Sequence, residues 1–268
     1  MDKLVLKDIG KTIRKNTILK DISLEIEPGV LGIIGQNGAG KSTLLKIICG
    51  LFKSTSGNVT LNDIPITEQP NQVMDKLGFF IEEPALYPYF TAGQQLEHCM
   101  ALRDFSDESY AKQIIEILDI ESFIDKKISK YSSGMKQRLG IACAVIHNPS
   151  IIVLDEPTNS LDITAIRQIR ELIKSMRDDG KTIIITSHIL TEIEDVCDQV
   201  VMMDNGAIID KFSLDTINKH YEDIYEIRLE KKKEIIEFLN DYYDSNAFKI
   251  YENHIILEMG ENKLSGEL

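Results

Sequence analysis

The chain has 268 residues, 43% of them apolar, and a formal net charge of −13 at pH 7. This length accommodates one large domain or two modest ones, and the apolar fraction supports a substantial core. The negative charge argues against general nucleic-acid binding, which requires a basic face. Because the N-terminus lacks the apolar core of a secretory signal and no run approaches the ~18 apolar residues that span a bilayer, we expect an intracellular protein.

Short apolar or alternating runs predict strands in the first 212 residues. They are 4–9, 18–26, 30–34, 56–61, 77–81, 151–154, 182–186, 199–203 and 207–210. A helix is expected to start at 43–49, the stretch 91–146 is mostly helical in pattern, and 163–177 is an amphipathic helix. Strands that alternate with helices imply an α/β fold with a parallel sheet. The early strands are expected to be antiparallel, so the layout is mixed.

The pattern changes after about residue 213. Residues 224–229 alternate between apolar and polar side chains, as in a strand. Residues 231–242 have a helical pattern, and 248–259 form a predicted hairpin. We therefore expect a β-α-β-β accessory domain over 213–260, followed by a polar, disordered tail at 261–268. The four cysteines are scattered without a metal-binding spacing and are expected to be buried, reduced thiols. They are Cys49, Cys99, Cys143 and Cys197.

The octet at 35–42, GQNGAGKS, fits the phosphate-binding pattern G-x-x-x-x-G-K-[ST]. It lies between a predicted strand and a predicted helix, where backbone N–H groups and the helix dipole favour an anion. Lys41 can reach the β- and γ-phosphates of a nucleotide, and the Ser42 hydroxyl can ligate Mg²⁺. The predicted nucleotide-binding residues here are Gly35, Asn37, Gly38, Gly40, Lys41, Ser42 and Thr43.

A second motif is the run IIVLDE at 151–156, four apolar residues followed by two acids. Ligands of α/β sheets bind at the carboxyl ends of the strands. Asp155 can therefore hold Mg²⁺, and Glu156 can polarise the water that attacks the phosphate. These residues predict a nucleotide-hydrolysing site that holds Mg²⁺.

Three further segments complete an ordered series of motifs. Residues 131–138 (YSSGMKQR), 159–162 (NSLD) and 186–188 (TSH) follow the phosphate loop along the chain. With these segments the chain resembles the ATP-binding subunit of an ABC transporter. The first segment resembles the family's signature, the second its D-loop and the third its switch-histidine loop. The resemblance covers most of the first 210 residues. It implies an ATPase domain over 1–212 with a helical subdomain at about 84–148, a P-loop NTPase core and an antiparallel β subdomain.

The resemblance also implies a dimer, identical or mixed, with ATP between the phosphate loop of one subunit and the signature of the other. Ser132 and Gly134 would contact the γ-phosphate across the interface, and His188 would hold the attacking water. Lys41, Glu156 and His188 are thus the predicted catalytic residues. Separate membrane-spanning permease subunits are implied as partners. The protein is expected on the inner face of the cell membrane, with no nucleic-acid partner.

Departures from the family pattern indicate a subfamily. Ile13 stands where the family has an aromatic residue that stacks on adenine, so nucleotide selectivity should be relaxed. Glu82 stands where the family has a glutamine that connects Mg²⁺ to the membrane partner, and its carboxylate is a suitable metal ligand. Ser133 replaces a signature glycine. The stretch around Glu82 resembles that of exporters conferring immunity to lantibiotics and bacitracin, so a peptide-antibiotic exporter is the leading hypothesis.

Two questions stay open at this point. The alternative function is a soluble ABC-type ATPase with no transport role, such as an iron–sulfur assembly ATPase. The segment 82–105 is either an exposed docking groove for the permease or a buried aromatic cluster, and it contains Tyr87, Tyr89 and Phe90.

Overall fold

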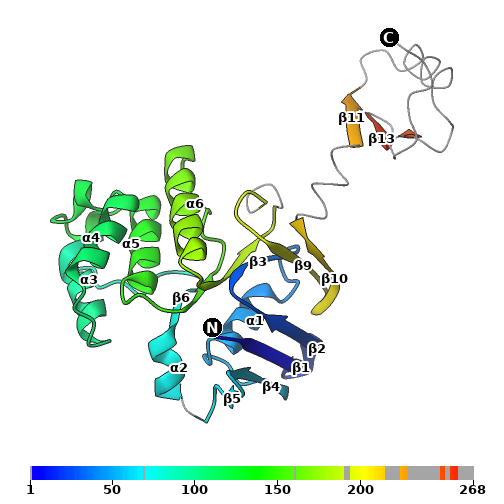
Figure 1. Ribbon diagram of the computed structural model, residues 1–268, viewed down its shortest axis with the longest axis horizontal. Helices are drawn as coiled ribbons and strands as arrows, with labels where there is room; N and C mark the ends of the chain where they lie inside the picture. The colour runs from blue at the N-terminus through cyan, green and yellow to red at the C-terminus, as the bar shows by residue number, and fades with distance from the viewer. Residues whose placement is uncertain are drawn as a thin grey trace. The chain divides into compact units, whose positions relative to one another are not determined.

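The structure is a computed structural model that describes residues 2–68, 70–159, 161–189 and 194–214, and three strands beyond them (Figure 1). The chain divides into two compact units, Met1–Phe212 and Ser213–Leu268. Each unit is described by itself. The first unit holds all of the predicted nucleotide-site residues.

The first unit is built on a six-stranded sheet with strand order β10-β9-β3-β8-β7-β6. Its members are β3 (Gly29–Ile34), β6 (Leu77–Phe80), β7 (Ile151–Leu154), β8 (Thr182–Ser187), β9 (Gln199–Asp204) and β10 (Ala207–Ser213). The strands from β9 to β6 pair in parallel. Every residue of β7 and β8 is buried, which explains why β7 is a continuous apolar run and why β8 contains three consecutive isoleucines instead of an alternating pattern. Their carboxyl ends therefore meet at one edge of the sheet.

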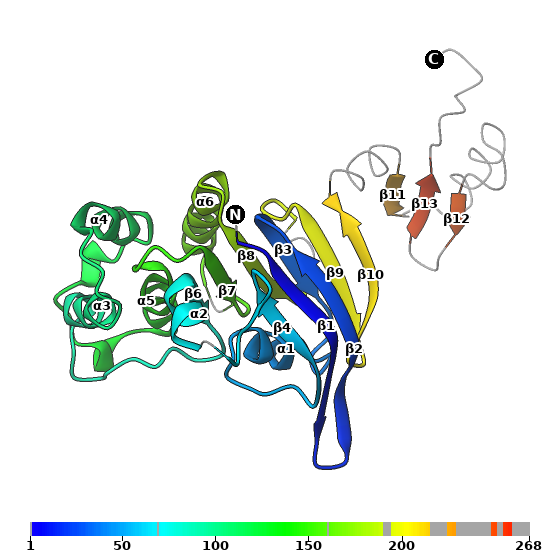
Figure 2. The same cartoon turned by 60° about the horizontal axis from the view of Figure 1, so that its bottom comes forward.

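A second, antiparallel sheet has the order β2-β1-β4-β5. It consists of β1 (Leu4–Ile13), β2 (Asn16–Ile26), β4 (Ser56–Leu61) and β5 (Ile64–Pro65). Helix α1 (Lys41–Ile48) lies between the two sheets (Figure 2). Its Leu44 and Leu45 are fully buried in one cluster with Leu6 of β1 and Ile33 of β3. The phosphate-loop helix is thus fixed from both sides by apolar packing.

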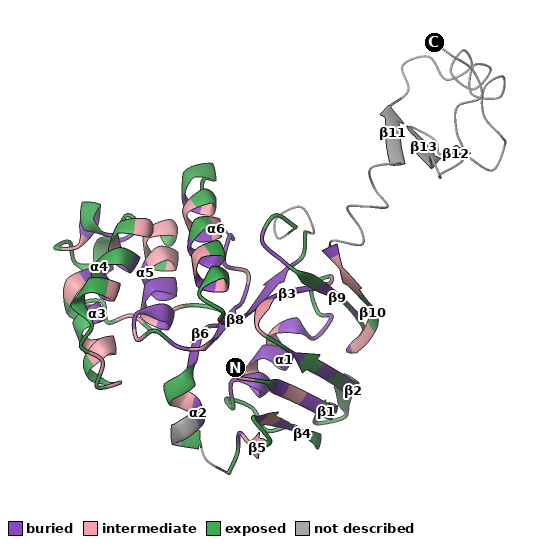
Figure 3. Ribbon diagram, in the orientation of Figure 1, coloured by how far each residue is buried: buried purple, intermediate pink, exposed green. Residues whose placement is uncertain are grey.

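Helices α3 (Ala92–Ala101), α4 (Glu108–Ile117) and α5 (Ser133–Val145) gather on one side of the parallel sheet (Figure 2). Short 3₁₀ turns at Glu121–Phe123 and Ile128–Lys130 separate α4 from α5. Side-chain caps start these helices, including a capping box at Thr91. Helix α5 packs against both α3 and β6 and is buried on more than one face (Figure 3). The described residues contain no helix long and apolar enough to cross a membrane.

Two more helices complete the first unit. Helix α6 (Ile163–Asp178) packs on β3, β8 and α4 through one apolar face and begins at the capping side chain of Asp162. Helix α2 (Pro70–Lys76) precedes β6. The second unit contains β11 (Ile224–Arg228), β12 (Phe248–Ile250) and β13 (His254–Glu258) in an antiparallel sheet of order β11-β13-β12.

The predicted fold class is confirmed: a P-loop NTPase core with a mixed sheet arrangement, an antiparallel subdomain and a helical subdomain. The bounds of β4 and β7 match the prediction, and the C-terminal hairpin is present as β12 and β13. The predictions missed α2 and β5 and ended β1 four residues too early. The helix expected at 231–242 and the tail at 261–268 lie outside the described residues.

Candidate active site

The phosphate loop connects the end of β3 to the first turn of α1. Gly38 and Gly40 have φ angles of 87° and 102°, in the left-handed region that only glycine adopts without strain. Gly40 is also the N-cap of α1, so the free N–H groups of the helix face the loop. The loop therefore has the curvature and the partial positive charge that an anionic phosphate requires.

A cavity of about 460 Å³ opens above this loop. It is lined by Ile18, Gln36, Asn37, Gly38, Gly40, Lys41, Ser42, Thr43, Glu156, Asn159 and His188. Most of the residues predicted from the two motifs thus share one cavity. Gly35 is not among the lining residues, and there an added Cβ would come 2.4 Å from the carbonyl oxygen of Met203.

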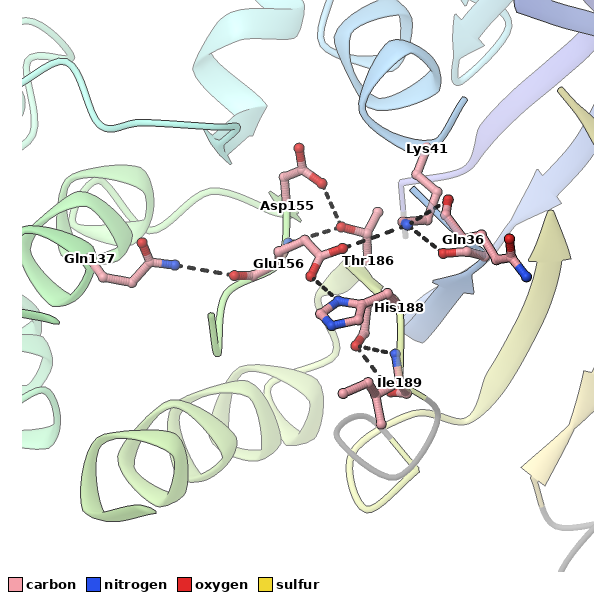
Figure 4. Close-up of polar contacts among 10 residues, drawn as sticks. Gln36, Lys41, Gln137, Asp155, Glu156, Thr186, His188 and Ile189 are labelled. Atoms are coloured by element: carbon pink, nitrogen blue, oxygen red, sulfur yellow. Dashed lines mark hydrogen bonds and ion pairs between the residues drawn. The ribbon is translucent and has the colours of Figure 1, made fainter. Parts of the chain in front are cut away.

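Lys41 is 6% exposed, and its ammonium lies inside the phosphate loop (Figure 4). It donates hydrogen bonds to the carbonyl oxygens of Gly35 at 2.6 Å and Gln36 at 3.4 Å. Its Nζ also lies 3.6 Å from Oε1 of Glu156. The positive charge is thus positioned between the loop and the carboxylate that follows β7.

Asp155 and Glu156 are held by one hydroxyl group on the neighbouring strand. Thr186 of β8 is fully buried and donates its Oγ1 proton to Oδ1 of Asp155 at 2.6 Å. The same Oγ1 accepts the backbone N–H of Glu156 at 2.9 Å. The sequence placed Thr186 in a motif but gave no role to its side chain, because the contact depends on the pairing of β7 with β8.

Glu156 is also held in an uncommon backbone conformation, with φ of 47°. Gln137 of α5 donates its Nε2 protons to the carbonyl oxygens of Glu156 and Pro157, both at 3.2 Å. A left-handed non-glycine residue costs about 1–3 kcal/mol and persists where the surroundings over-determine it. Gln137 and Thr186 supply that restraint. They were not among the predicted site residues.

The side chain of Glu156 connects Lys41 to His188. Its Oε2 lies 2.7 Å from Nδ1 of His188, which follows β8 (Figure 4). A carboxylate that faces a cavity and contacts an imidazole is suited to orient a water and accept its proton. Lys41 and His188 therefore both contact Glu156, and the three predicted catalytic residues lie together.

The signature residues lie in a different cavity. Ser132 caps α5 by accepting the backbone N–H of Met135 at 3.3 Å. Ser132 and Gly134 line a cavity of about 360 Å³ with Leu161 and Asp162, and this cavity shares no lining residue with the phosphate-loop cavity. Within one chain the structure does not bring Ser132 and Gly134 to Lys41.

Glu82 lies in the loop after β6, with φ of 60°. Its side chain is 61% exposed, and its Oε1 lies 2.5 Å from Nζ of Lys46 on α1. It shares a cavity of about 650 Å³ with Asp155 and Glu156. Glu82 is therefore near the acidic pair, while its direct partner is a lysine that the sequence analysis did not single out.

Ile13 lies at the end of β1 and is 43% exposed. It does not line the phosphate-loop cavity, where Ile18 is the apolar lining residue instead. Neither residue offers an aromatic ring to a nucleotide base.

Comparison with known proteins identifies the family. The family model described as ABC transporter matches residues 19–159. The bacitracin transport ATP-binding protein BcrA of Bacillus licheniformis is 30% identical over 251 residues, 93% of this chain and 82% of its own. The lantibiotic transport ATP-binding protein SrtF of Streptococcus pyogenes is 37% identical over 207 residues, 77% of this chain and 89% of its own.

The solved structures agree with these relatives. An ATP-binding subunit of an ABC transporter superposes with a TM-score of 0.74 at 28% identity, covering 82% of this chain and 93% of its own. The dimeric cassette MJ0796 superposes with a TM-score of 0.72 at 29% identity, over 79% of this chain and 98% of its own. The same cassette is known in a post-hydrolysis state bound to ADP and phosphate. The chain belongs to the ABC transporter family as an ATP-binding subunit, and it is an energy-coupling ATPase.

Proposed function

We propose that this ATPase drives an exporter that removes a peptide antibiotic, or a similar toxic compound, from the cell. The observation that carries the proposal is the 30% identity to a bacitracin transport protein, which extends over 93% of this chain. The identity to a lantibiotic transport protein points to the same class of substrate. The alternative of an iron–sulfur assembly ATPase is not favoured, because these relatives are transport proteins.

In the proposed reaction Glu156 accepts a proton from the attacking water, and His188 orients that water through its contact with Glu156. Lys41 neutralises negative charge on the phosphates. Nucleotide entry would replace the carbonyl contacts of Lys41, since the ammonium now bonds to the loop itself. Gly35, Asn37, Gly38, Gly40 and Thr43 supply the phosphate cradle.

Mg²⁺ fits the donor set of this site. The Ser42 hydroxyl and the Asp155 carboxylate are hard oxygen ligands, and Glu82 offers a third oxygen nearby. Among the described residues no three His, Cys, Asp or Glu side chains form a metal cluster. The ion would thus share its coordination with the nucleotide, where it neutralises phosphate charge.

The functional unit is proposed to be a dimer of ATPase subunits. Ser132 and Gly134 lie in a cavity separate from Lys41, so a complete site needs the signature of a second subunit. A mixing experiment tests a homodimer. Lys41→Ala and Gly134→Asp should each be inactive alone, yet their mixture should recover activity, because one site of each mixed dimer is intact. No recovery would favour a dimer with a different ATPase subunit.

The docking surface for the permease is proposed to be the segment after Glu82. Tyr89 is 83% exposed and Tyr87 is 51% exposed. The Tyr87 ring also packs against Phe90 and His98, with centroids 5.0 and 5.5 Å apart. The segment thus combines an aromatic cluster with an exposed edge. Permease binding there would hold the ATPase on the inner face of the cell membrane.

The test is resistance in a sensitive host that expresses this chain together with its permease. Bacitracin and a lantibiotic are applied separately, and the minimal inhibitory concentration is measured for each. The proposal expects a higher concentration for at least one peptide, lost in the Glu156→Gln variant at equal expression. Unchanged sensitivity to both peptides would contradict the proposed substrate class and leave the ATPase assignment intact.

A further inference from the structure

Two cysteine side chains meet between α3 and α5. Cys99 of α3 and Cys143 of α5 both line a cavity of about 330 Å³, and the thiol of each has the largest influence on the pKa of the other. Both are partly accessible to solvent, whereas Cys49 and Cys197 are buried. The two helices pack directly against each other. The prediction of four buried thiols was wrong for this pair, because sequence spacing does not reveal that two helices bring the cysteines together.

The surroundings distinguish the two thiols chemically. The neighbouring Cys143 side chain lowers the pKa of Cys99 to about 7, helped by the Gln95 amide and the positive charge of Arg103. The Gln95 Nε2 lies 3.7 Å from the Cys99 sulfur. The Cys99 side chain in turn raises the pKa of Cys143, and burial adds to that rise. Cys99 is thus the more readily ionised thiol of the two, and therefore the better nucleophile, while Cys143 keeps its proton.

We propose that Cys99 and Cys143 are a reversible redox pair that a hydroperoxide converts into a disulfide joining α3 to α5. The Cys99 thiolate attacks one peroxide oxygen, the O–O bond breaks, and Cys99 becomes a sulfenic acid. The released hydroxide takes the Cys143 proton. The Cys143 sulfur then attacks the Cys99 sulfur and expels a second hydroxide, which is protonated to water. With hydrogen peroxide, two thiols yield one disulfide and two waters, and an external dithiol reverses the reaction.

The site borders the loop that carries Glu82. The cavity is also lined by Phe80, Ile81 and Pro84, which flank or belong to that loop. At Gly140 of α5 an added Cβ would lie only 2.5 Å from the Phe80 ring and 2.6 Å from Pro84, so α5 packs closely on this loop. Disulfides of intracellular proteins are mostly transient and regulatory, which fits a partly exposed pair better than a structural bridge.

The test is peptide mapping of the whole chain after treatment with hydrogen peroxide. The expected product is a Cys99–Cys143 disulfide within one chain, with the loss of two hydrogen atoms in intact mass and full reversal by dithiothreitol. Cys49 and Cys197 serve as internal controls, since burial raises the pKa of each thiol. They should react with iodoacetamide at least about tenfold more slowly than Cys99 in the native protein.

Two variants separate the roles of the thiols. Cys143→Ser should stop the reaction at the sulfenic acid, so that dimedone labels Cys99. Cys99→Ser should prevent both the disulfide and dimedone labelling at Cys143. Sulfenic acid that accumulates at Cys99 of the unmodified chain without a disulfide would overturn the proposal. A disulfide that joins two chains, or equally fast oxidation of Cys49 or Cys197, would overturn it too.

Discussion

The ammonium of Lys46 on α1 lies 2.5 Å from Oε1 of Glu82, in the loop that leads from β6 to the helical subdomain. Lys46 is five residues after Lys41 on the phosphate-loop helix. The ion pair thus connects the helix that begins at the nucleotide site to the loop proposed to contact the permease. A glutamine at position 82 would keep the shape of this connection but remove its negative charge.

We predict that Glu82 tunes coupling to the permease more than basal hydrolysis. Glu82→Gln should leave substantial ATPase activity in the isolated subunit and change the free energy of unfolding by less than ~1 kcal/mol, because the Glu82 carboxylate is largely exposed to solvent. Resistance conferred by the assembled transporter should change, and Glu82→Ala should reduce it further.

Lys46→Met is the matched control, because it removes the other charged partner of the same ion pair. If the carboxylate itself acts on Mg²⁺ or the permease, Glu82→Ala should reduce resistance more than Lys46→Met. Glu83→Ala controls for a nearby loop acid. Equal resistance in Glu82→Ala and Glu83→Ala, at equal expression, would remove any special role for Glu82.

The sequence predicted the parts of the site that depend on motifs and the parts of the fold that depend on long apolar runs. Strand β7 matched because four buried apolar residues leave little ambiguity. Helix α2 was missed because seven residues give too short a pattern. The contact of Thr186 with Asp155 and the ion pair of Lys46 with Glu82 could not be predicted. Both depend on which elements become neighbours, which a single sequence does not encode locally.

Glu156→Gln should keep nucleotide binding and lower kcat by about 10²–10⁴-fold, the usual contribution of a general base. The amide keeps the size of the side chain but cannot accept a proton from water. Steady-state phosphate release measures the rate, and size-exclusion chromatography with ATP should detect a trapped dimer. Lys41→Ala should instead weaken nucleotide binding. A Glu156→Gln rate near that of the unmodified protein would contradict the assignment of Glu156.

Thr186→Val should destabilise the protein and slow hydrolysis. Valine matches threonine in shape but leaves the partly buried Glu156 N–H and the buried Asp155 carboxylate without their shared partner. An unsatisfied buried polar group costs about 1–3 kcal/mol, which urea unfolding can measure. Thr186→Ser retains the hydroxyl and should recover most of the activity. If serine and valine behave alike, the hydroxyl does not hold the acidic pair.

GTP should compete with ATP better than a stacking aromatic would permit. Ile13 is 43% exposed and does not line the cavity, so it gives a base no ring to stack on. An ATP preference below about 100-fold, or ~2.7 kcal/mol, is expected from titrations of both nucleotides with Mg²⁺. Ile13→Tyr should strengthen ATP binding by about 1 kcal/mol if this position faces the base. A larger ATP preference in the unmodified protein would contradict relaxed selectivity.

His147 should make stability depend on pH in the mildly acidic range. Burial, with the nearby charge of Arg103, lowers the pKa of His147 from 6.5 to about 4. Between these values the unfolded chain binds a proton that the folded protein does not, so the free energy of unfolding falls as the pH drops through this window.

The free energy of unfolding should fall by at most about 3 kcal/mol through this titration. The actual decrease should be smaller, because the imidazole is not fully buried. His147→Gln removes the titration and should flatten the pH dependence between pH 7 and pH 4.5. Urea unfolding of both proteins at these two pH values measures the difference. Asp75 and Lys181 also act on this imidazole and are unchanged in the variant, so they serve as a constant background. Parallel pH profiles of the two proteins would show that His147 does not titrate with folding.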